Sequence, residues 1–196
     1  MSRVPLPPIN ADGSYTTPAV GMMIDGDGAR NIYGPPGTKP LDYLANAGGP
    51  SNWYGVVTDN GKPTGNPVIQ GPNDPFPGYY VSATSYEHEG FKRTDPNRYV
   101  DSNAVIYIVL PGHWRMLAKG VVLGCKARVT DRKTGKVTDA VVADFGPKAK
   151  LGEASIACAR FFGVPSSPKN GGSDAKRFIY QFWPGVPAPG YDLKPA

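Results

Sequence analysis

The sequence predicts a mostly β protein whose core is a small closed β-barrel, with long Gly/Pro-rich loops and one or two short helices. Apolar runs of strand length, rich in β-branched and aromatic residues, occur at 78–86, 104–111, 123–131 and 176–183. The 25 glycines and 22 prolines among 196 residues favour turns and stiff loops between these runs. Because so little helix is available to cover sheet edges, we expect the strands to close on themselves.

Length and composition fit a single domain over residues 1–196. A chain of this length can bury a sizeable core, and the 40% hydrophobic and 11% aromatic content is too high for a disordered chain. No stretch approaches the ~20 consecutive apolar residues of a membrane helix, and the opening MSRVPLPPIN lacks the apolar core of a signal peptide. We therefore expect a soluble monomer without a membrane partner.

Charge and cysteine content argue against several other classes. The net charge is +5 and the isoelectric point is about 9.1, but the Lys and Arg residues form no cluster of five or more, so we expect no nucleic-acid partner. The chain has two cysteines, Cys125 and Cys158, and two histidines, His88 and His113, and their spacing is not that of a metal site. We expect no metal and no organic cofactor. Two buried thiols are favoured over a disulfide bridge, which an oxidising compartment would still permit.

The first third of the chain reads as an arm followed by loops. Residues 1–21 are Pro-rich and without periodicity, which predicts an extended arm across the surface. From 25 to 77 the chain is dominated by Gly, Pro, Asn and Asp, interrupted by the helix-like run LDYLANAG that ends at Gly48. We expect this part of the chain to supply loops more than core.

A hairpin followed by a helix is the clearest local signal. In CKARVTDRKTGKVTDAVVAD, two alternating runs flank the polar turn RKTG, where Gly135 can adopt a positive φ. The segment EASIACARFFG then predicts one short helix with an acid at its start and Gly163 at its end. Ser155 has no nucleophile elbow around it and no nearby histidine, so we interpret it as a hydrogen-bond donor at the helix start.

Asp144 and Glu153 are the candidate catalytic residues. Asp144 closes the apolar run AVVA, and Glu153 follows nine residues later beyond a Gly-Pro loop. Hydrolysis of a glycosidic bond needs two carboxyl groups across a cleft, one to protonate the leaving oxygen and one to activate water or attack the sugar. The alternative is ordinary turn chemistry for Asp144 and compensation of the helix dipole by Glu153, and spacing alone favours that alternative.

A family resemblance changes this balance. The stretch VVLGCKARVTDRKTGKVTDAVVADFGPKAKLGEASIACARFFGV resembles the signature region of the chitosanases of glycoside hydrolase family 75, with a strand-ending Asp, a Gly-Pro and a Gly-Glu-x-Ser before a helix. IDGDGA, PGYYVSATSY and YVDSNAVIYIVLP extend the resemblance over most of the chain. It implies Asp144 and Glu153 as the essential acids of an endo-acting, inverting hydrolase of chitosan, with carboxyl groups about 6.5 to 9.5 Å apart. The same stretch is similar to double-psi β-barrel proteins, including wall-lytic enzymes, which supports the barrel by analogy.

The roles of the two acids follow from their expected surroundings. At a helix N-terminus Glu153 is favoured as the anion, whereas apolar strand neighbours favour the neutral form of Asp144. We therefore expect Asp144 to be the general acid and Glu153 the base.

Further residues are candidates for substrate binding. Asp25 and Asp27 in DGDG resemble the start of a calcium loop, but Ala29 and Arg30 do not fit one, so we prefer contacts to amino groups of the polymer, with a solvated turn as the alternative. Ser82 and Thr84 share one strand face, where they could bind sugar hydroxyls or only solvate a sheet edge. The aromatic candidates for stacking on sugar rings are Trp53, Tyr54, Tyr79, Tyr80, Trp114 and Trp183. Of these, we prefer Trp53 and Tyr80.

Two other functions remain open at this stage. A peptidoglycan hydrolase, of the secreted-effector or phage-lysin type, would use the same two acids on an anionic wall polymer, and net charge alone does not separate it from a chitosanase. A non-catalytic glycan-binding module would keep the aromatic residues without needing both acids. All three functions imply a polysaccharide partner and a secreted or cell-envelope location.

Overall fold

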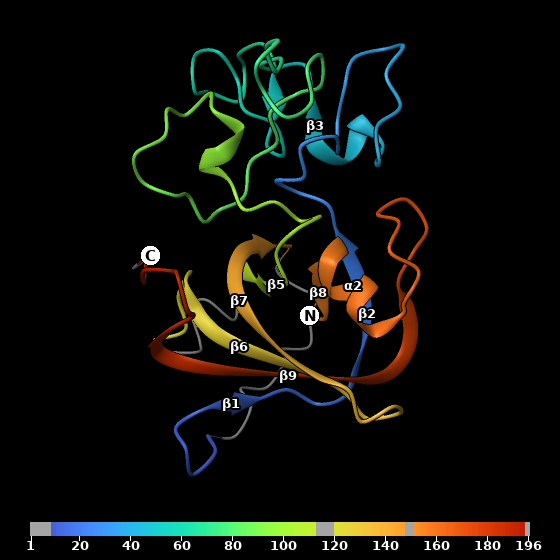
Figure 1. Cartoon of the computed structure of the whole chain (residues 1–196), viewed down its shortest axis with the longest axis vertical. Helices are drawn as coiled ribbons and strands as arrows, with labels where there is room; N and C mark the ends of the chain where they lie inside the picture. Colours follow the sequence, from blue (N-terminus) through green and yellow to red (C-terminus); the bar gives the residue numbers. More distant parts are fainter. Residues whose placement is uncertain (1–8, 113–119, 148–150, 195–196) are drawn as a thin grey trace.

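The protein is a mostly β structure built around a closed barrel, as predicted (Figure 1). The computed structural model describes residues 9–112, 120–147 and 151–194. Strand β9 pairs with both β2 and β6, so the strands close in the order β9, β2, β8, β5, β7, β6. The elements, in chain order, are β1 (Tyr15–Thr16), β2 (Val20–Asp25), η1 (Leu44–Ala47), β3 (Gly48–Gly49), β4 (Asn52–Trp53), η2 (Pro96–Arg98), β5 (Tyr107–Pro111), β6 (Cys125–Asp131), β7 (Val137–Gly146), β8 (Glu153–Ser155), α2 (Ile156–Phe162) and β9 (Ser173–Pro187).

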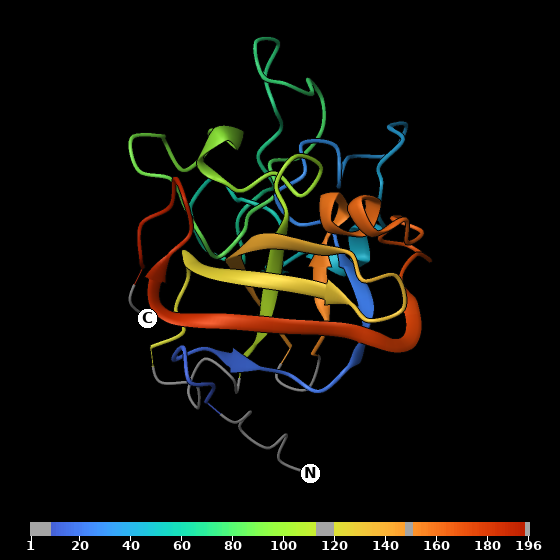
Figure 2. The same ribbon diagram turned by 60° about the horizontal axis from the view of Figure 1, so that its bottom comes forward.

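Local turn chemistry and a long last strand explain the closure. The β6–β7 hairpin is confirmed, with Thr130 opposite Val137 and Gly135 at a φ of 72° in the turn. The expected last strand, 176–183, is part of the 15-residue β9. Figure 2 shows β9 running along the lower edge of the barrel, where its length lets it reach β2 at one end and β6 along the other.

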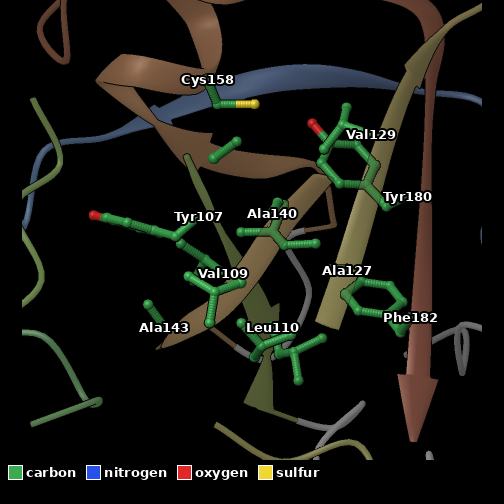
Figure 3. Packing of buried hydrophobic residues seen from close by; sticks show 14 of the residues in the cluster. Tyr107, Val109, Leu110, Ala127, Val129, Ala140, Ala143, Cys158, Tyr180 and Phe182 are labelled. Carbon is green, nitrogen blue, oxygen red and sulfur yellow. The ribbon is translucent and has the colours of Figure 1, made fainter. Parts of the chain in front are cut away.

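The main core fills the barrel. Its largest fully buried side chains include Tyr107 from β5 and Tyr180, Phe178 and Phe182 from β9; Figure 3 shows Tyr107 on the opposite side of the core from Tyr180 and Phe182. Cys125 and Cys158 are buried free thiols, which confirms the interpretation favoured above. The apolar surroundings of Cys158 raise the pKa of its thiol to about 12, so this thiol stays protonated and packs as a small apolar group.

The loop-rich part of the chain lies on one side of the barrel, seen above it in Figure 1. It has two small apolar clusters of its own, one around Ile32, Trp53 and Ile156 and one around Val57 and Tyr99. The strand expected at 78–86 is absent from the described elements, and only isolated bridges form there. The backbone N–H groups of 80, 81 and 83 donate to three different loop segments, so no continuous ladder can form.

The expected arm at 1–21 is partly strand. Tyr15 and Thr16 pair with β9, and β2 starts at Val20. Tyr15 and Val20 pack against the main core, and this apolar burial ties the end of the arm to the barrel. Within the described residues, no helix has the length and apolar character needed to cross a membrane.

Asp131 anchors the hairpin turn, and its removal is predicted to destabilise the barrel. Its buried carboxylate accepts hydrogen bonds from Lys133 N at 2.9 Å and Thr134 Oγ1 at 2.9 Å, and lies 3.4 Å from Arg177 Nε on β9. The substitution Asp131→Ala leaves Arg177 without its partner, so we expect a loss of about 3 kcal/mol in the free energy of unfolding. Urea denaturation followed by circular dichroism measures this loss.

Asp139→Ala serves as the matched control on the same hairpin. The side chain of Asp139 is 52% exposed and pairs with Arg128, so its loss should cost less than about 1 kcal/mol. Equal effects of the two substitutions would contradict the anchoring role of Asp131.

Candidate active site

A cavity of about 610 Å³ lies where the ends of barrel strands meet the loop-rich part of the chain. Five carboxyl groups reach it from the described residues, together with Lys169 as the only cation among the lining residues. Asp25 ends β2, Asp144 lies near the end of β7, and Glu153 starts β8. The lining consists of residues 23–27, Tyr33, Asp42, Asn46, Tyr54, Val109, residues 144–147, Glu153 and residues 168–171.

A β-bulge directs Asp144 into this cavity. Along the β5–β7 pairing, Ile108 lies opposite Val142 but Val109 lies opposite Asp144, so Ala143 is the extra residue. Such a bulge bends a strand and re-aims the side chain that follows it. Asp144 consequently lines the cavity although it is only 6% exposed.

The hydrogen bonds to Asp144 distinguish its two oxygens. Oδ1 accepts bonds from Ser85 N at 2.9 Å, from the Ser85 hydroxyl, and from Phe145 N at 2.8 Å. All the hydrogen bonds that the described residues donate to this carboxyl group therefore go to Oδ1, which makes Oδ2 the oxygen available for a proton.

The surroundings of Asp144 raise the pKa of its carboxyl group to near neutral pH. Burial and the neighbouring Asp25 carboxyl raise the pKa of Asp144 to about 7, although the hydrogen bonds from Ser85 and Phe145 lower it. The neutral form predicted from the apolar strand is therefore substantially populated near pH 7, and a second carboxyl group contributes to this in addition to burial.

Asp25 and Asp27 share the site with Asp144. Each of the three residues offers an oxygen within 4.8 Å of the others. Burial raises the pKa of Asp25 and raises that of Asp27 well above its usual range, where the neighbouring carboxyl of Asp25 adds to the effect. Like charges this close cannot all be present in a buried site, so the group retains protons at pH 7.

The hydroxyl of Tyr107 indicates where one of these protons is held. Tyr107 Oη lies 2.8 Å from the Asp27 carbonyl oxygen and 3.0 Å from Asp25 Oδ2. A phenol has one hydrogen and a carbonyl oxygen can only accept, so both contacts are hydrogen bonds when Asp25 is protonated and donates to Tyr107. On Asp27, Oδ1 accepts a bond from Tyr33 Oη at 2.9 Å.

Three neighbouring carboxyl oxygens could also hold a divalent cation, because such oxygens are the ligands that hard cations prefer. The sequence did not predict this grouping, since Asp144 joins the two other acids only through the fold. The tyrosine hydrogen bonds and shared protons account for Asp25 and Asp27 without a cation.

Glu153 is not in the first turn of a helix, contrary to the expectation. It starts β8, where Glu153 pairs with Met23 and Ala154 with Ile108, and these barrel contacts keep the segment extended. Helix α2 begins after Ser155, whose hydroxyl accepts a bond from Cys158 N at 3.1 Å. Ser155 thus caps the helix as an acceptor instead of a donor, and Glu153 lies outside the helix, so the expected effect of the helix dipole on its carboxyl group does not apply.

The carboxyl group of Glu153 lies over Gly146. A Cβ at position 146 would be 2.8 Å from Glu153 Oε2, so the absence of a side chain there makes room for this carboxylate. Asp144 and Gly146 are two residues apart on β7, which corresponds to ~7 Å along an extended strand. Both acids line one cavity, and the Glu153 carboxyl group lies over the strand position two residues beyond Asp144.

The structure brings only some of the expected substrate contacts to the cavity. Ser82 is buried beneath it, where its hydroxyl donates to Gly55 O at 2.9 Å, accepts from Gly28 N at 3.0 Å and lies 3.5 Å from Asp27 Oδ1. It holds the Asp27 loop in place, and its burial leaves it unavailable to a sugar. Thr84 does not line the cavity, because its hydroxyl is bonded to Tyr86 O and Val100 N.

Among the aromatic candidates, Tyr54 is the one that lines the cavity. Trp53 is 9% exposed and packs in the cluster around Ile32, and Tyr80 packs against the same cluster, so neither ring is presented to the cavity. Successive side chains of an extended segment point to opposite sides, which explains why Trp53 faces the core and Tyr54 the solvent. Trp114 lies outside the described residues, and Tyr79 and Trp183 are not among the lining residues.

Sequence reasoning missed Ser85, Tyr107, Tyr33 and Gly146. Ser85 lies within an expected strand, but its partner Asp144 is far along the chain, so no local pattern relates them. Tyr107 appeared only as one of several apolar strand residues. The Gly-Pro after Asp144 is interpreted above only as part of a loop, whereas the structure shows that Gly146 also gives Glu153 its space.

The fold and the site together define a β-barrel protein with a buried cluster of carboxyl groups in a solvent-accessible cavity. No protein-family model matches the chain, and no curated protein sequence is significantly similar to it. Its function is therefore inferred from the site.

Ser85 is predicted to lower the pKa of Asp144. Its hydroxyl donates to the carboxylate and so favours the charged form. The substitution Ser85→Ala removes this donor, and we expect the pKa of Asp144 to rise above its value of about 7. Carbon-detected NMR titration of the aspartate carboxyl groups measures the change. Ser85→Thr keeps the hydroxyl and should stay close to the wild type; a lower or unchanged pKa in Ser85→Ala would contradict the role assigned to this residue.

Proposed function

We propose that this protein is an endo-acting glycoside hydrolase that cleaves the β-1,4 bonds of chitosan by an inverting mechanism, in line with its resemblance to glycoside hydrolase family 75. One observation carries the proposal. Asp144, whose pKa is raised to about 7, and Glu153, on the far side of Val109, line one cavity. An acid that is partly protonated near neutrality, opposite a second carboxylate, is the arrangement that acid–base hydrolysis of an acetal needs.

In the proposed reaction Asp144 is the general acid. Its Oδ2 donates a proton to the glycosidic oxygen as the bond between that oxygen and the anomeric carbon breaks. The three donors on Oδ1 stabilise the carboxylate that results, so proton release costs less than it would in an apolar site.

Glu153 is the general base of the same step. It removes a proton from a water molecule as the water oxygen bonds to the anomeric carbon from the face opposite the leaving group. An inverting mechanism requires carboxyl groups about 6.5 to 9.5 Å apart, with room for that water between them. A proton from solvent then restores Asp144, and the proton gained by Glu153 returns to solvent.

The charge of the cavity favours chitosan over peptidoglycan. Five carboxyl groups and one lysine among the described residues line it, although the chain as a whole carries a net charge of +5. Lys169 is also engaged, since its Nζ donates to Pro40 O at 3.0 Å and lies over the Tyr43 ring. A locally acidic cavity attracts the ammonium groups of polyglucosamine and repels the carboxylates of a peptidoglycan stem.

Replacing either acid is predicted to abolish turnover. Asp144→Asn cannot donate the proton and Glu153→Gln cannot accept one, so each should lower kcat about 10² to 10⁴-fold. Reducing-end release from chitosan, chitin and purified peptidoglycan measures activity, and proton NMR of the first product anomer measures inversion. Asp139→Asn, on the exposed face of the same hairpin, is the matched control and should retain activity.

Each outcome of that assay decides between functions. Activity on chitosan that both substitutions remove supports the proposal, and activity on peptidoglycan alone would identify a wall hydrolase that uses the same residues. Binding to a glycan without turnover in the wild type would indicate a non-catalytic module.

Gly146→Ala is predicted to impair catalysis without unfolding the protein. The added Cβ would lie 2.8 Å from Glu153 Oε2 and would displace this carboxylate. A displaced general base should lower kcat about 100-fold while KM changes little. Gly71→Ala is the control, because the nearest atom to its Cβ is 3.7 Å away. Unchanged kcat in a folded Gly146→Ala variant would argue against Glu153 as the base.

A further inference from the structure

An exposed aromatic ring forms part of the cavity wall. Tyr54 is 66% exposed and lines the cavity formed with the carboxyl groups. Several large apolar side chains are exposed elsewhere on the surface, but the exposed ring of Tyr54 also lines the acidic cavity, where its face is accessible to a ligand.

The backbone around Tyr54 is held in place. Tyr54 N donates to Ala47 O at 3.0 Å, and the preceding Trp53 is packed in the cluster around Ile32. Gly48 lies against the ring, since a Cβ at that position would be 3.1 Å from Tyr54 Cδ1. The ring therefore extends from an anchored segment at a defined place on the wall.

Asn46 presents a fixed hydrogen-bond acceptor on the same wall. Its Nδ2 donates to both carboxylate oxygens of the buried Asp42, each at 3.0 Å. Asp42 is held in turn by a bond from Tyr43 N at 2.8 Å. With the amide nitrogen engaged, the oxygen Oδ1 of the exposed Asn46 is the atom left for a ligand donor.

We propose that Tyr54 and Asn46 form a sugar-binding subsite outside the bond that is cleaved, which takes a hexosamine unit of the polymer. The apolar face of the pyranose ring stacks on Tyr54, and a hydroxyl or ammonium group of the same unit donates to Asn46 Oδ1. This subsite belongs to the loop-rich part of the chain, whereas Asp144 and Glu153 belong to barrel strands, so the two contact different units of one chain. The inference rests on the proposed glycan substrate.

The subsite has a consequence for substrate length. Oligomers too short to reach Tyr54 cannot gain from it, whereas longer oligomers bind through both regions of the cavity. Tyr54→Ala should therefore weaken binding of long oligomers about tenfold and leave the shortest ones unaffected. Tyr54→Phe keeps the ring and should bind like the wild type, and Asn46→Leu should show a weaker version of the Tyr54→Ala defect.

Calorimetric titration with glucosamine dimer and hexamer tests this proposal. The titrations use the Glu153→Gln variant as background, so that no ligand is cleaved, and wild-type protein with the dimer for comparison. Phe91→Ala is the matched control, because Phe91 is exposed to 41% but does not line the cavity. The expected result is a hexamer affinity that falls about tenfold in Tyr54→Ala, less in Asn46→Leu, and not in Tyr54→Phe or Phe91→Ala. Dimer affinity should be unchanged in every variant.

Two results would overturn the subsite while leaving the hydrolase intact. One is wild-type hexamer affinity in a folded Tyr54→Ala variant. The other is an equal loss for dimer and hexamer, which would mean that Tyr54 acts at the cleaved bond. If the wild type cleaves no glycan, the hydrolase proposal fails separately, and loss of hexamer binding in Tyr54→Ala would still support the subsite.

Discussion

The pairing of β9 with both β2 and β6 is the constraint on which the rest of the structure depends. It closes the barrel, and closure leaves no exposed edge among the barrel strands. Closure also fixes the order β2, β8, β5, β7 around the barrel, so the ends of strands that carry Asp25, Glu153 and Asp144 lie around one opening. The loop-rich part of the chain then covers that opening on one side and converts it into a cavity.

Burying these carboxyl groups next to one another is electrostatically unfavourable. Asp25, Asp27 and Asp144 offer oxygens within 4.8 Å of one another in largely buried positions, which disfavours three charges. Proton sharing and the hydroxyls of Tyr33 and Tyr107 offset the unfavourable burial. Tyr107 links the two regions physically, because its ring lies in the barrel core (Figure 3) and its hydroxyl contacts Asp25 and the Asp27 carbonyl oxygen. The same crowding of buried acids that is unfavourable for folding raises the pKa of Asp144, so this carboxyl group can hold a proton at neutral pH.

The contrast between local and overall charge matters for recognition. Salt screens charges beyond about 8 Å at physiological ionic strength, so a ligand of the proposed kind would respond to the charges close to the cavity more than to the net charge of the chain. For the proposed function, the five carboxyl groups that the described residues place around the cavity are therefore more informative than the net charge of +5.

Features encoded by adjacent residues were determined by the sequence itself. The hairpin turn with Gly135, the helix that ends at Gly163, the free thiols and the closed barrel were all predicted, because turn chemistry, capping and apolar patterning act over a few residues. The short separation of Asp144 and Glu153 permitted a pair, and only the family resemblance indicated that the two acids act together. Only the tertiary structure decided that Glu153 lies in a strand, that Asp25 and Asp27 join Asp144, that Ser85 binds its carboxylate, and that Tyr54 instead of Trp53 faces the cavity. Each of these depends on contacts between segments far apart in the chain, which local propensity does not encode.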